Sequence, residues 1–105
     1  MEDCIFCKII SKEINSDLLY EDEKCIVIKD LYPKAKTHLL IIPKKHIESI
    51  ITLEDEDQII TGHLINTVKN IAKKLNLKGY KLQINVGKDG GQEIFHLHIH
   101  LLSQF

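Results

Sequence analysis

Residues 81–102 read KLQINVGKDGGQEIFHLHIHLL, two runs of alternating polar and apolar residues on either side of a glycine-rich turn. Successive side chains of a β-strand point to opposite faces of the sheet, so a period of two is typical of a strand with one buried face. The pattern predicts strands over residues 80–87 and 94–102, joined by a turn at 87–93. Two such strands form an antiparallel hairpin.

The second run carries three histidines, His96, His98 and His100, which alternate with aliphatic residues and are therefore expected on one face of the strand. Neighbouring imidazoles would lie about 6.5–7 Å apart along the chain. On the preceding strand Asn85 is expected to face the same side, and the turn brings Gly91 to the end of this surface. The intervening aliphatic residues are expected to pack into the core.

The rest of the chain combines short strands with helical segments. Apolar spacing predicts one short helix and three strands, within residues 4–14 and at 18–21, 25–29 and 37–43. From Thr52, apolar residues recur every three or four positions as far as Leu75, which predicts one long amphipathic helix ending near Gly79. The expected class is α+β: an antiparallel sheet of about five strands with one long and one short helix, in a single domain over residues 1–105.

The composition is typical of a globular protein, with 105 residues, 44% hydrophobic and 28% charged, and a formal net charge of -1. This balanced charge gives no global positive field, which argues against nucleic-acid binding. The apolar runs are too short to span a bilayer, and the N-terminal residues lack the basic and apolar regions of a secretory signal. Three cysteines, an odd number, favour reduced thiols, so the cytoplasm is the expected location.

The residues alone leave three interpretations of the histidine run open. The first is a solvated polar face. The second is a catalytic zinc site on His96, His98 and His100, because His-x-His on a strand supplies two ligands. The third is nucleophilic catalysis at phosphorus, since neutral imidazole is available near physiological pH. The glycine-rich turn at 87–93 favours the third, because several of its backbone N–H groups can point at one anion.

The stretch HLHIHLL (96–102) fits the pattern His-x-His-x-His-x-x with apolar residues at x, and so resembles the histidine triad (HIT) superfamily of nucleotide-binding proteins and hydrolases. The similarity covers nearly the whole chain, through CIFCKIISKEI (4–14), YEDEKCIVIKDLYPKAKTHLLIIPKKH (20–46) and NVGKDGGQEIFHLHIH (85–100). In order and spacing, these segments are similar to the branch that hydrolyses purine nucleoside phosphoramidates.

The resemblance implies that His98 is the nucleophile, which attacks the α-phosphorus and forms a nucleotidyl-imidazole that water hydrolyses. His100 and Asn85 would donate hydrogen bonds to the phosphoryl oxygens, together with the backbone after Gly91. His96 is the third catalytic histidine of the pattern.

The resemblance also implies a nucleoside site, in which Asp30 accepts the ribose hydroxyls. The other implied nucleotide-binding residues are Gln92 and Glu93 in the loop, and Ile5, Phe6, Ile9, Ile28 and Leu31 around the base. Glu93 stands where this branch carries a small hydroxyl residue. Two interpretations of Glu93 stay open, an acid near the leaving group and a solvated carboxylate at a strand start.

Cys4 and Cys7 form a C-x-x-C pair, which can supply half of a tetrahedral structural zinc site. In zinc-containing relatives the other two ligands correspond to His46 and His96. The alternative is two reduced cysteines packed on a helix. No cofactor is expected for catalysis itself.

Three further residues carry simpler expectations. Cys25 is expected in the core, because it lies in an apolar strand. His38 is expected beside the triad, and His63 on the surface of the long helix.

The expected function is hydrolysis of the P–N bond of purine nucleoside 5′-phosphoramidates, giving the nucleoside monophosphate and an amine. Two alternatives stay open: a dinucleoside polyphosphate hydrolase of the same superfamily, and a nucleotide-binding sensor or scaffold with vestigial activity. The expected partners are a purine nucleotide and a second copy of the chain, since members of this branch form homodimers whose sheets join edge to edge. Neither a nucleic acid nor a membrane is expected as a partner.

Overall fold

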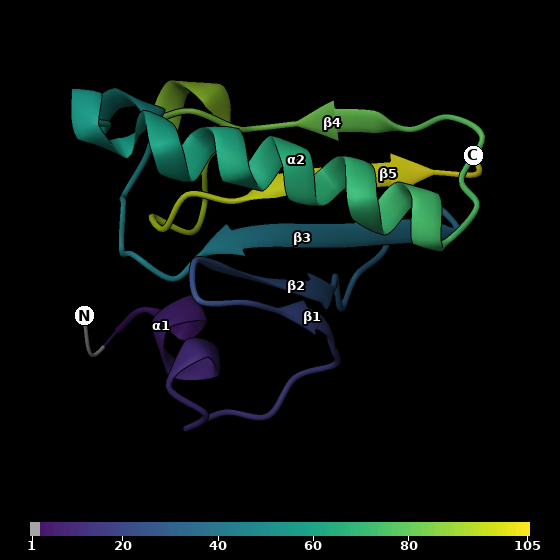
Figure 1. Cartoon of the computed structure of the whole chain (residues 1–105). Coiled ribbons are helices and arrows are strands. Elements are labelled where there is room, and N and C mark those ends of the chain that lie inside the picture. The colour runs from purple at the N-terminus through teal and green to yellow at the C-terminus, as the bar shows by residue number, and fades with distance from the viewer. Residues whose placement is uncertain (1–2) are drawn as a thin grey trace.

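The computed structural model describes residues 3–105, which form one five-stranded antiparallel sheet with two α-helices packed against it (Figure 1). The helices are α1 (Ile5–Ile10) and α2 (Gln58–Lys74). The strands are β1 (Leu18–Glu21), β2 (Cys25–Lys29), β3 (Thr37–Pro43), β4 (Lys81–Gln83) and β5 (Ile99–Ser103). Three 3-10 turns complete the structure, η1 (Ile50–Thr52), η2 (Asp55–Asp57) and η3 (Lys88–Gly90). The predicted α+β class is confirmed; residues 1–2 of the predicted domain lie outside the described residues.

The strand order is β1-β2-β3-β5-β4, so the last strand of the chain is inserted between β3 and β4 (Figure 1). The predicted strands 18–21, 25–29 and 37–43 are confirmed with their predicted bounds. The register pairs His100 of β5 with Leu40 on one side and with Gln83 on the other. His100 therefore lies in the interior of the sheet, where neighbouring strands fix its position.

The two faces of the sheet have different partners. Alternation sends one set of side chains toward α2, which crosses this face (Figure 1). This core includes Val27, Leu39, Ile41, Leu64, Val68, Leu97, Ile99 and Leu101. The opposite face buries a smaller cluster against α1, made of Phe6, Ile9, Ile26, Ile28, Leu40 and Ile42. Because α1 is only 6 residues long, it covers β2 and part of β3 and leaves this face free at β5 and β4.

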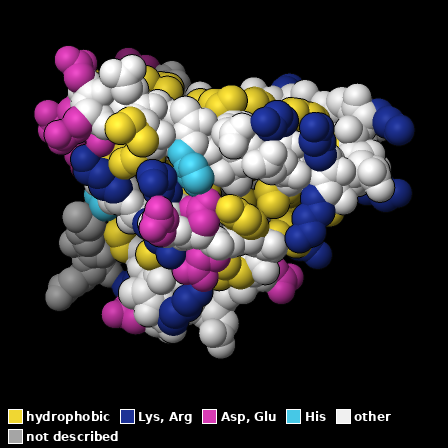
Figure 2. Space-filling view, viewed as in Figure 1, with side chains coloured by type: hydrophobic (Ala, Val, Ile, Leu, Met, Phe, Trp, Pro, Cys, Tyr) yellow, Lys and Arg dark blue, Asp and Glu magenta, His cyan; other side chains and the backbone are white. Residues whose placement is uncertain are grey.

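Charge along α2 follows the helix dipole, with Asp55 and Glu56 in the turn before the helix and Lys73 and Lys74 in its last turn. Figure 2 shows acidic side chains gathered at the end of this face where α2 begins, and lysines at the end where it stops. Within residues 3–105, none of the helices combines the length and the hydrophobicity needed to span a bilayer.

Both strands of the predicted C-terminal hairpin are shorter than expected. The first covers only residues 81–83, and Leu82, expected in the core, is 39% exposed because β4 is an edge strand. The second begins at Ile99 rather than at residue 94. The backbone leaves the sheet there because Leu97 N–H donates to the carbonyl of Ile47, 2.6 Å away, instead of to a neighbouring strand. Alternation nevertheless continues, and Leu97 packs with Ile99 in the core.

The long helix begins at Gln58, six residues later than the cap predicted at Thr52. Residues 50–52 and 55–57 form two 3-10 turns instead, held by side chains that accept from backbone N–H groups and by an ion pair to Lys45, which is distant in sequence. The Thr52 hydroxyl accepts from the Ser49 N–H, and the Asp57 carboxylate accepts from the Glu54 N–H at 3.0 Å and pairs with Lys45. The short helix likewise ends early, at Ile10, before Lys12 adopts a left-handed φ of 71°.

Candidate active site

A cavity of about 530 Å³ opens on the free part of the sheet, beside α1. Side chains of β3, β5 and β4 line its base, and the loops at 30–34 and 91–94 line its ends. The lining residues are Phe6, Asp30, Tyr32, Lys34, His38, Leu40, Lys81, Gln83, Asn85, Gly91, Glu93, Ile94, His98, His100, Leu102 and Phe105. Two of the three histidines of the motif are therefore in the cavity.

The His98 ring is fixed by the main chain of its own segment. Its Nδ1 donates to the carbonyl of His96, 2.7 Å away, which leaves the lone pair on Nε2. The edge of the ring packs against Phe6, with ring centroids 5.1 Å apart. Burial lowers the pKa of His98, so its imidazole is neutral near physiological pH. A neutral imidazole with a free Nε2 is in the state that a nucleophile requires.

A chain of contacts fixes the tautomer of His100. The Lys34 N–H donates to Nδ1 of His38 at 3.1 Å, so a neutral His38 carries its proton on Nε2. That Nε2 lies 2.9 Å from Nδ1 of His100 and donates to it. His100 must then carry its own proton on Nε2, as a hydrogen-bond donor. Burial, with repulsion from His98 and His38, lowers the pKa of His100 to about 4. The prediction that His38 lies beside the triad is confirmed.

The loop between β4 and His96 is shaped by two glycines and one buried amide. Gly87 and Gly91 have φ of 70° and 83°, the left-handed region in which a side chain is strained. The Gln92 side chain is buried, where it accepts from the Gly87 N–H at 2.9 Å and donates to the Glu48 carbonyl at 2.7 Å. Gln92 thus shapes the loop from beneath, while Gly91 and Asn85 line the cavity.

Asp30 lies at the opposite end of the cavity, just beyond β2. One carboxylate oxygen accepts from the Tyr32 N–H at 2.8 Å, and the other lies 3.4 Å from Nε2 of His38. One lysine is part of the same loop, since Lys34 lines the cavity, and no carboxylate within residues 3–105 pairs with it. An acceptor and a cation therefore occupy this end together.

The implied base-binding residues are dispersed. Phe6 lines the cavity, whereas Ile9 and Ile28 are buried in the cluster beneath α1. Leu31 is 82% exposed outside the cavity lining, and Ile5 lines a second, separate hollow.

Eight residues that line the cavity are not among the predicted site residues: Tyr32, Lys34, Leu40, Lys81, Gln83, Ile94, Leu102 and Phe105. The alternation of the first hairpin strand could have identified Lys81 and Gln83, because they share the face of Asn85. Phe105 carries no such signal. The Lys81 ammonium lies 4.9 Å above its ring.

The third histidine of the motif, His96, is fully buried and turns toward α1 rather than into the cavity. Its Nε2 donates to the Pro43 carbonyl at 2.8 Å, so the lone pair of Nδ1 faces the two cysteines of the C-x-x-C pair. Nδ1 lies 3.3 Å from Sγ of Cys4 and 3.6 Å from Sγ of Cys7, and Cys7 lies 3.2 Å from Nδ1 of His46. Burial lowers the pKa of His96 to about 4.

These four ligand atoms lie within 4.8 Å of one another. In a tetrahedral zinc site with Zn–S of about 2.3 Å and Zn–N of about 2.1 Å, sulfur and nitrogen are about 3.6 Å apart. The sulfur–nitrogen distances of 3.2–3.6 Å therefore fit such a site, and a small contraction or expansion is all that binding would require.

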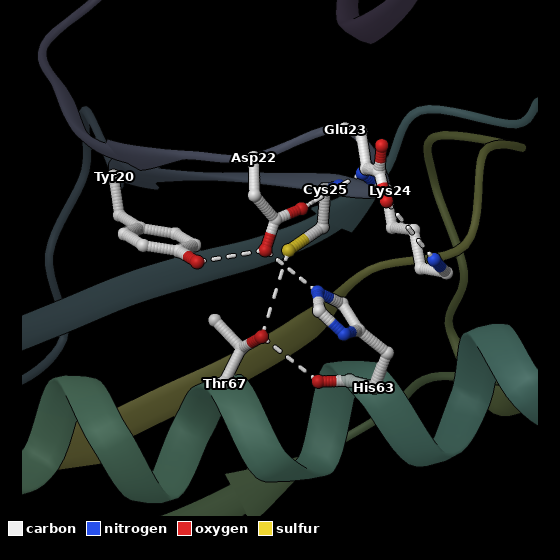
Figure 3. Close-up of polar contacts among 7 residues, drawn as sticks. All are labelled: Tyr20, Asp22, Glu23, Lys24, Cys25, His63 and Thr67. Atoms are coloured by element: carbon white, nitrogen blue, oxygen red, sulfur yellow. Dashed lines mark hydrogen bonds and ion pairs between the residues drawn. The ribbon is translucent and has the colours of Figure 1, made fainter.

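A separate polar cluster joins the β1–β2 turn to α2 (Figure 3). Asp22 accepts from the Tyr20 hydroxyl at 2.7 Å and lies 2.6 Å from Nε2 of His63. Burial alone would raise the pKa of Asp22, but these contacts and backbone N–H groups hold it well below its usual range. His63 was expected on the surface, but it is partly buried and connects α2 to the β1–β2 turn through Asp22. Cys25 is fully buried beside Thr67, as predicted for a core residue.

The fold and the cavity define the class of protein: a small α+β domain in which an oriented neutral histidine lies between a glycine loop and a second histidine donor. The family described as "Scavenger mRNA decapping enzyme C-term binding" matches residues 3–105. The chain is 48% identical to an uncharacterized HIT-like protein of Synechococcus elongatus over 102 residues, which cover 96% of this chain and 90% of that protein.

Solved structures show the same similarity. A HIT family hydrolase from Legionella pneumophila superposes with a TM-score of 0.92 and 42% identity, over 96% of this chain and 92% of the other. A histidine triad protein from Clostridium difficile superposes with a TM-score of 0.96 and 41% identity, over 100% and 93%. The chain belongs to the histidine triad (HIT) superfamily.

Proposed function

We propose that this protein hydrolyses the P–N bond of purine nucleoside 5′-phosphoramidates through a covalent intermediate on His98. The observation that carries the proposal is the orientation of His98, whose Nδ1–H is held by the His96 carbonyl so that Nε2 carries the lone pair in the cavity. The hydrolase activity named for the Legionella pneumophila relative supports the same reaction class.

The cavity offers a partner for each part of such a substrate. The Asp30 carboxylate, whose two oxygens contact the Tyr32 N–H and Nε2 of His38, accepts a ribose hydroxyl through a remaining lone pair. The Nε2–H of His100 and the amide of Asn85 donate to phosphoryl oxygens at the other end, beside Gly91. Donors fixed before the substrate arrives need no reorganisation as charge develops on phosphorus.

In the first step, Nε2 of His98 forms a bond to phosphorus while the P–N bond breaks and its electron pair stays on nitrogen. The nitrogen takes a proton from solvent in the open cavity and leaves as the amine. In the second step, water attacks phosphorus and loses a proton to solvent, and the His98–phosphorus bond breaks to restore the neutral imidazole. Imidazole is both nucleophile and leaving group, so one difficult displacement becomes two easier ones.

The residues that would hold a zinc ion are Cys4, Cys7, His46 and His96, and the ion would supply a structural cross-link rather than Lewis-acid chemistry. These ligands connect α1 to the segment after β3 and to the segment before β5. Because the His96 carbonyl orients His98, a cross-link at His96 would stabilise the position of the nucleophile.

We also propose a homodimer formed through the β4 edge. β4 has a neighbour on one side only, and Tyr80 and Leu82 at this edge are 40% and 39% exposed. An exposed edge strand presents unpaired backbone groups that a second copy can satisfy.

A dinucleoside polyphosphate hydrolase is the second candidate, and the cavity lysines favour it. Lys34 and Lys81 both line the cavity, and neither forms an ion pair with a carboxylate within residues 3–105. Cations that are not paired with carboxylates suit a substrate with more than one phosphate. The decapping description of the matching family points to the same class.

Competition between two substrates tests the proposal. Adenosine 5′-phosphoramidate and a diadenosine polyphosphate are mixed at equal concentration with wild type, and the products are followed by phosphorus NMR. We expect the phosphoramidate to be consumed first and a His98→Asn variant to leave both intact. Faster cleavage of the polyphosphate would establish the second candidate, and tight binding of adenosine monophosphate without hydrolysis of either would establish a sensor.

A further inference from the structure

A second hollow, of about 360 Å³, adjoins the active-site cavity. It is lined by Asp3, Cys4, Ile5, His46, Glu93, Ile94 and Phe95. Glu93 and Ile94 line both spaces, so they form the boundary between them. A group that leaves phosphorus on the side of Glu93 therefore has a second space into which it can extend.

Glu93 places a carboxylate at this boundary. Within the part of the chain that the structure describes, no ion pair or side-chain hydrogen bond involves its carboxylate, whereas Glu21 pairs with Lys12 and Lys44. Among residues 3–105, the lining of the hollow adds a second carboxylate, Asp3, and contains no lysine. The local field therefore favours a cation.

The rest of the wall consists of two of the candidate zinc ligands, Cys4 and His46, and of three apolar residues, Ile5, Ile94 and Phe95. Ile5 and Phe95 both line it and are 43% and 45% exposed, so part of their apolar surface remains accessible. A hollow with partly exposed apolar walls and a few charged groups at its rim has the character of a small-molecule site. Its volume suits a short chain rather than a protein segment.

We propose that Glu93 determines leaving-group specificity, selecting phosphoramidates whose amine carries an apolar chain that ends in a second cationic group. The chain contacts Ile5 and Phe95 in the hollow, and its distal ammonium pairs with Glu93 at the boundary between the two spaces. This inference rests on the proposed phosphoramidate hydrolysis and assigns Glu93 no part in bond cleavage.

Three adenosine 5′-phosphoramidates with leaving chains of equal length test it. Their amines are 1,5-diaminopentane, pentylamine and 5-aminopentanoate, which end in a cation, a methyl group and an anion. For wild type we expect kcat/KM to fall in that order. For Glu93→Gln we expect the preference for the cation over the methyl group to shrink by about fivefold, the range of a partly exposed ion pair.

Charge reversal gives the sharper comparison. Glu93→Lys should make the anionic substrate better than the cationic one. Asp89→Asn is the matched control, because Asp89 is an exposed carboxylate of the same loop that lines neither space. We expect this variant to keep the wild-type order.

An equal loss on all three substrates, or an unchanged order in Glu93→Lys, would overturn the inference. Unsubstituted adenosine 5′-phosphoramidate separates this failure from that of the proposed function. If wild type hydrolyses it but has equal kcat/KM for the three substituted substrates, only the specificity proposal fails. If wild type does not hydrolyse it, the proposed function fails, and the specificity proposal with it.

Discussion

Main-chain contacts decide what each histidine around the cavity can do. His96 and His98 donate to the carbonyls of Pro43 and His96, and His38 accepts from the Lys34 N–H. Each contact fixes one ring nitrogen and thereby the role of the other. The result is a lone pair at His96 that faces the two cysteines, a lone pair on Nε2 of His98 and, through His38, a donor at His100.

Replacement of His38 tests the role of this relay. In His38→Phe, Nδ1 of His100 loses its donor, so His100 can carry its proton on either nitrogen and presents Nε2–H only part of the time. We expect kcat to fall by about tenfold to a hundredfold, with KM changed much less. His38→Gln, whose amide can still donate, should recover part of kcat. A rise in KM as large as the fall in kcat, or no recovery of kcat in His38→Gln, would contradict a role of His38 in orienting His100.

The pH dependence of kcat/KM follows from burial of the same histidines. Protonation of His98 removes the nucleophilic lone pair, and burial lowers the pKa at which this happens; the pKa of His100 is lowered to about 4. The fall of the rate on the acid side should therefore be centred below pH 6.5, the ordinary value of histidine. Initial rates from pH 4 to 8 measure this. A decline centred at 6.5 or above would mean that the imidazoles titrate as if exposed.

At the level of elements, the sequence pattern predicted those bounds that depend on residues close together in the sequence. The bounds of β1, β2 and β3 follow from apolar runs closed by turn residues. The start of α2 does not, because Asp57 is held by Lys45, a residue distant in sequence that no periodicity reveals. The segment before β5 leaves the sheet for the same reason, since Ile47 supplies its hydrogen-bond partner.

The same distinction, between features set by neighbouring residues and features set by tertiary packing, applies to the site. The motif identified His98, His100 and Asn85, which line one cavity, because side-chain alternation is a local property. Lys34 and Phe105 reach that cavity only through the packing of loops and the chain end on the sheet, which no local pattern encodes.

The proposed zinc cross-link makes a prediction at this level. Chelation, or Cys7→Ser, should release one zinc ion per chain and lower Tm by about 5–10 °C, because the ligands connect three separate segments. Metal analysis and thermal melts measure both effects. Activity at 20 °C should change by less than about threefold, since none of the four proposed ligands lines the cavity. Immediate loss of activity with an unchanged Tm would instead support a catalytic zinc on the histidine motif.

At the scale of the whole molecule, the open β4 edge predicts a dimer. Light scattering should give twice the chain mass of 12.1 kDa, and Leu82→Lys should convert the protein to monomer by placing a charge at the edge. Ile51→Lys is the control, since Ile51 is 72% exposed but lies in η1, outside β4. A monomeric wild type, or an unaffected Leu82→Lys dimer, would contradict this assembly.

The two helices leave part of the sheet uncovered: α2 covers one face and α1 covers part of the other. His98 lines the cavity over the uncovered part. The most direct test is rapid-quench intact mass spectrometry with adenosine 5′-phosphoramidate. Wild type should show a transient adenylylated species that decays to adenosine monophosphate, and His98→Ala should show none. Turnover by His98→Ala at the wild-type rate, without any adduct, would contradict nucleophilic catalysis by His98.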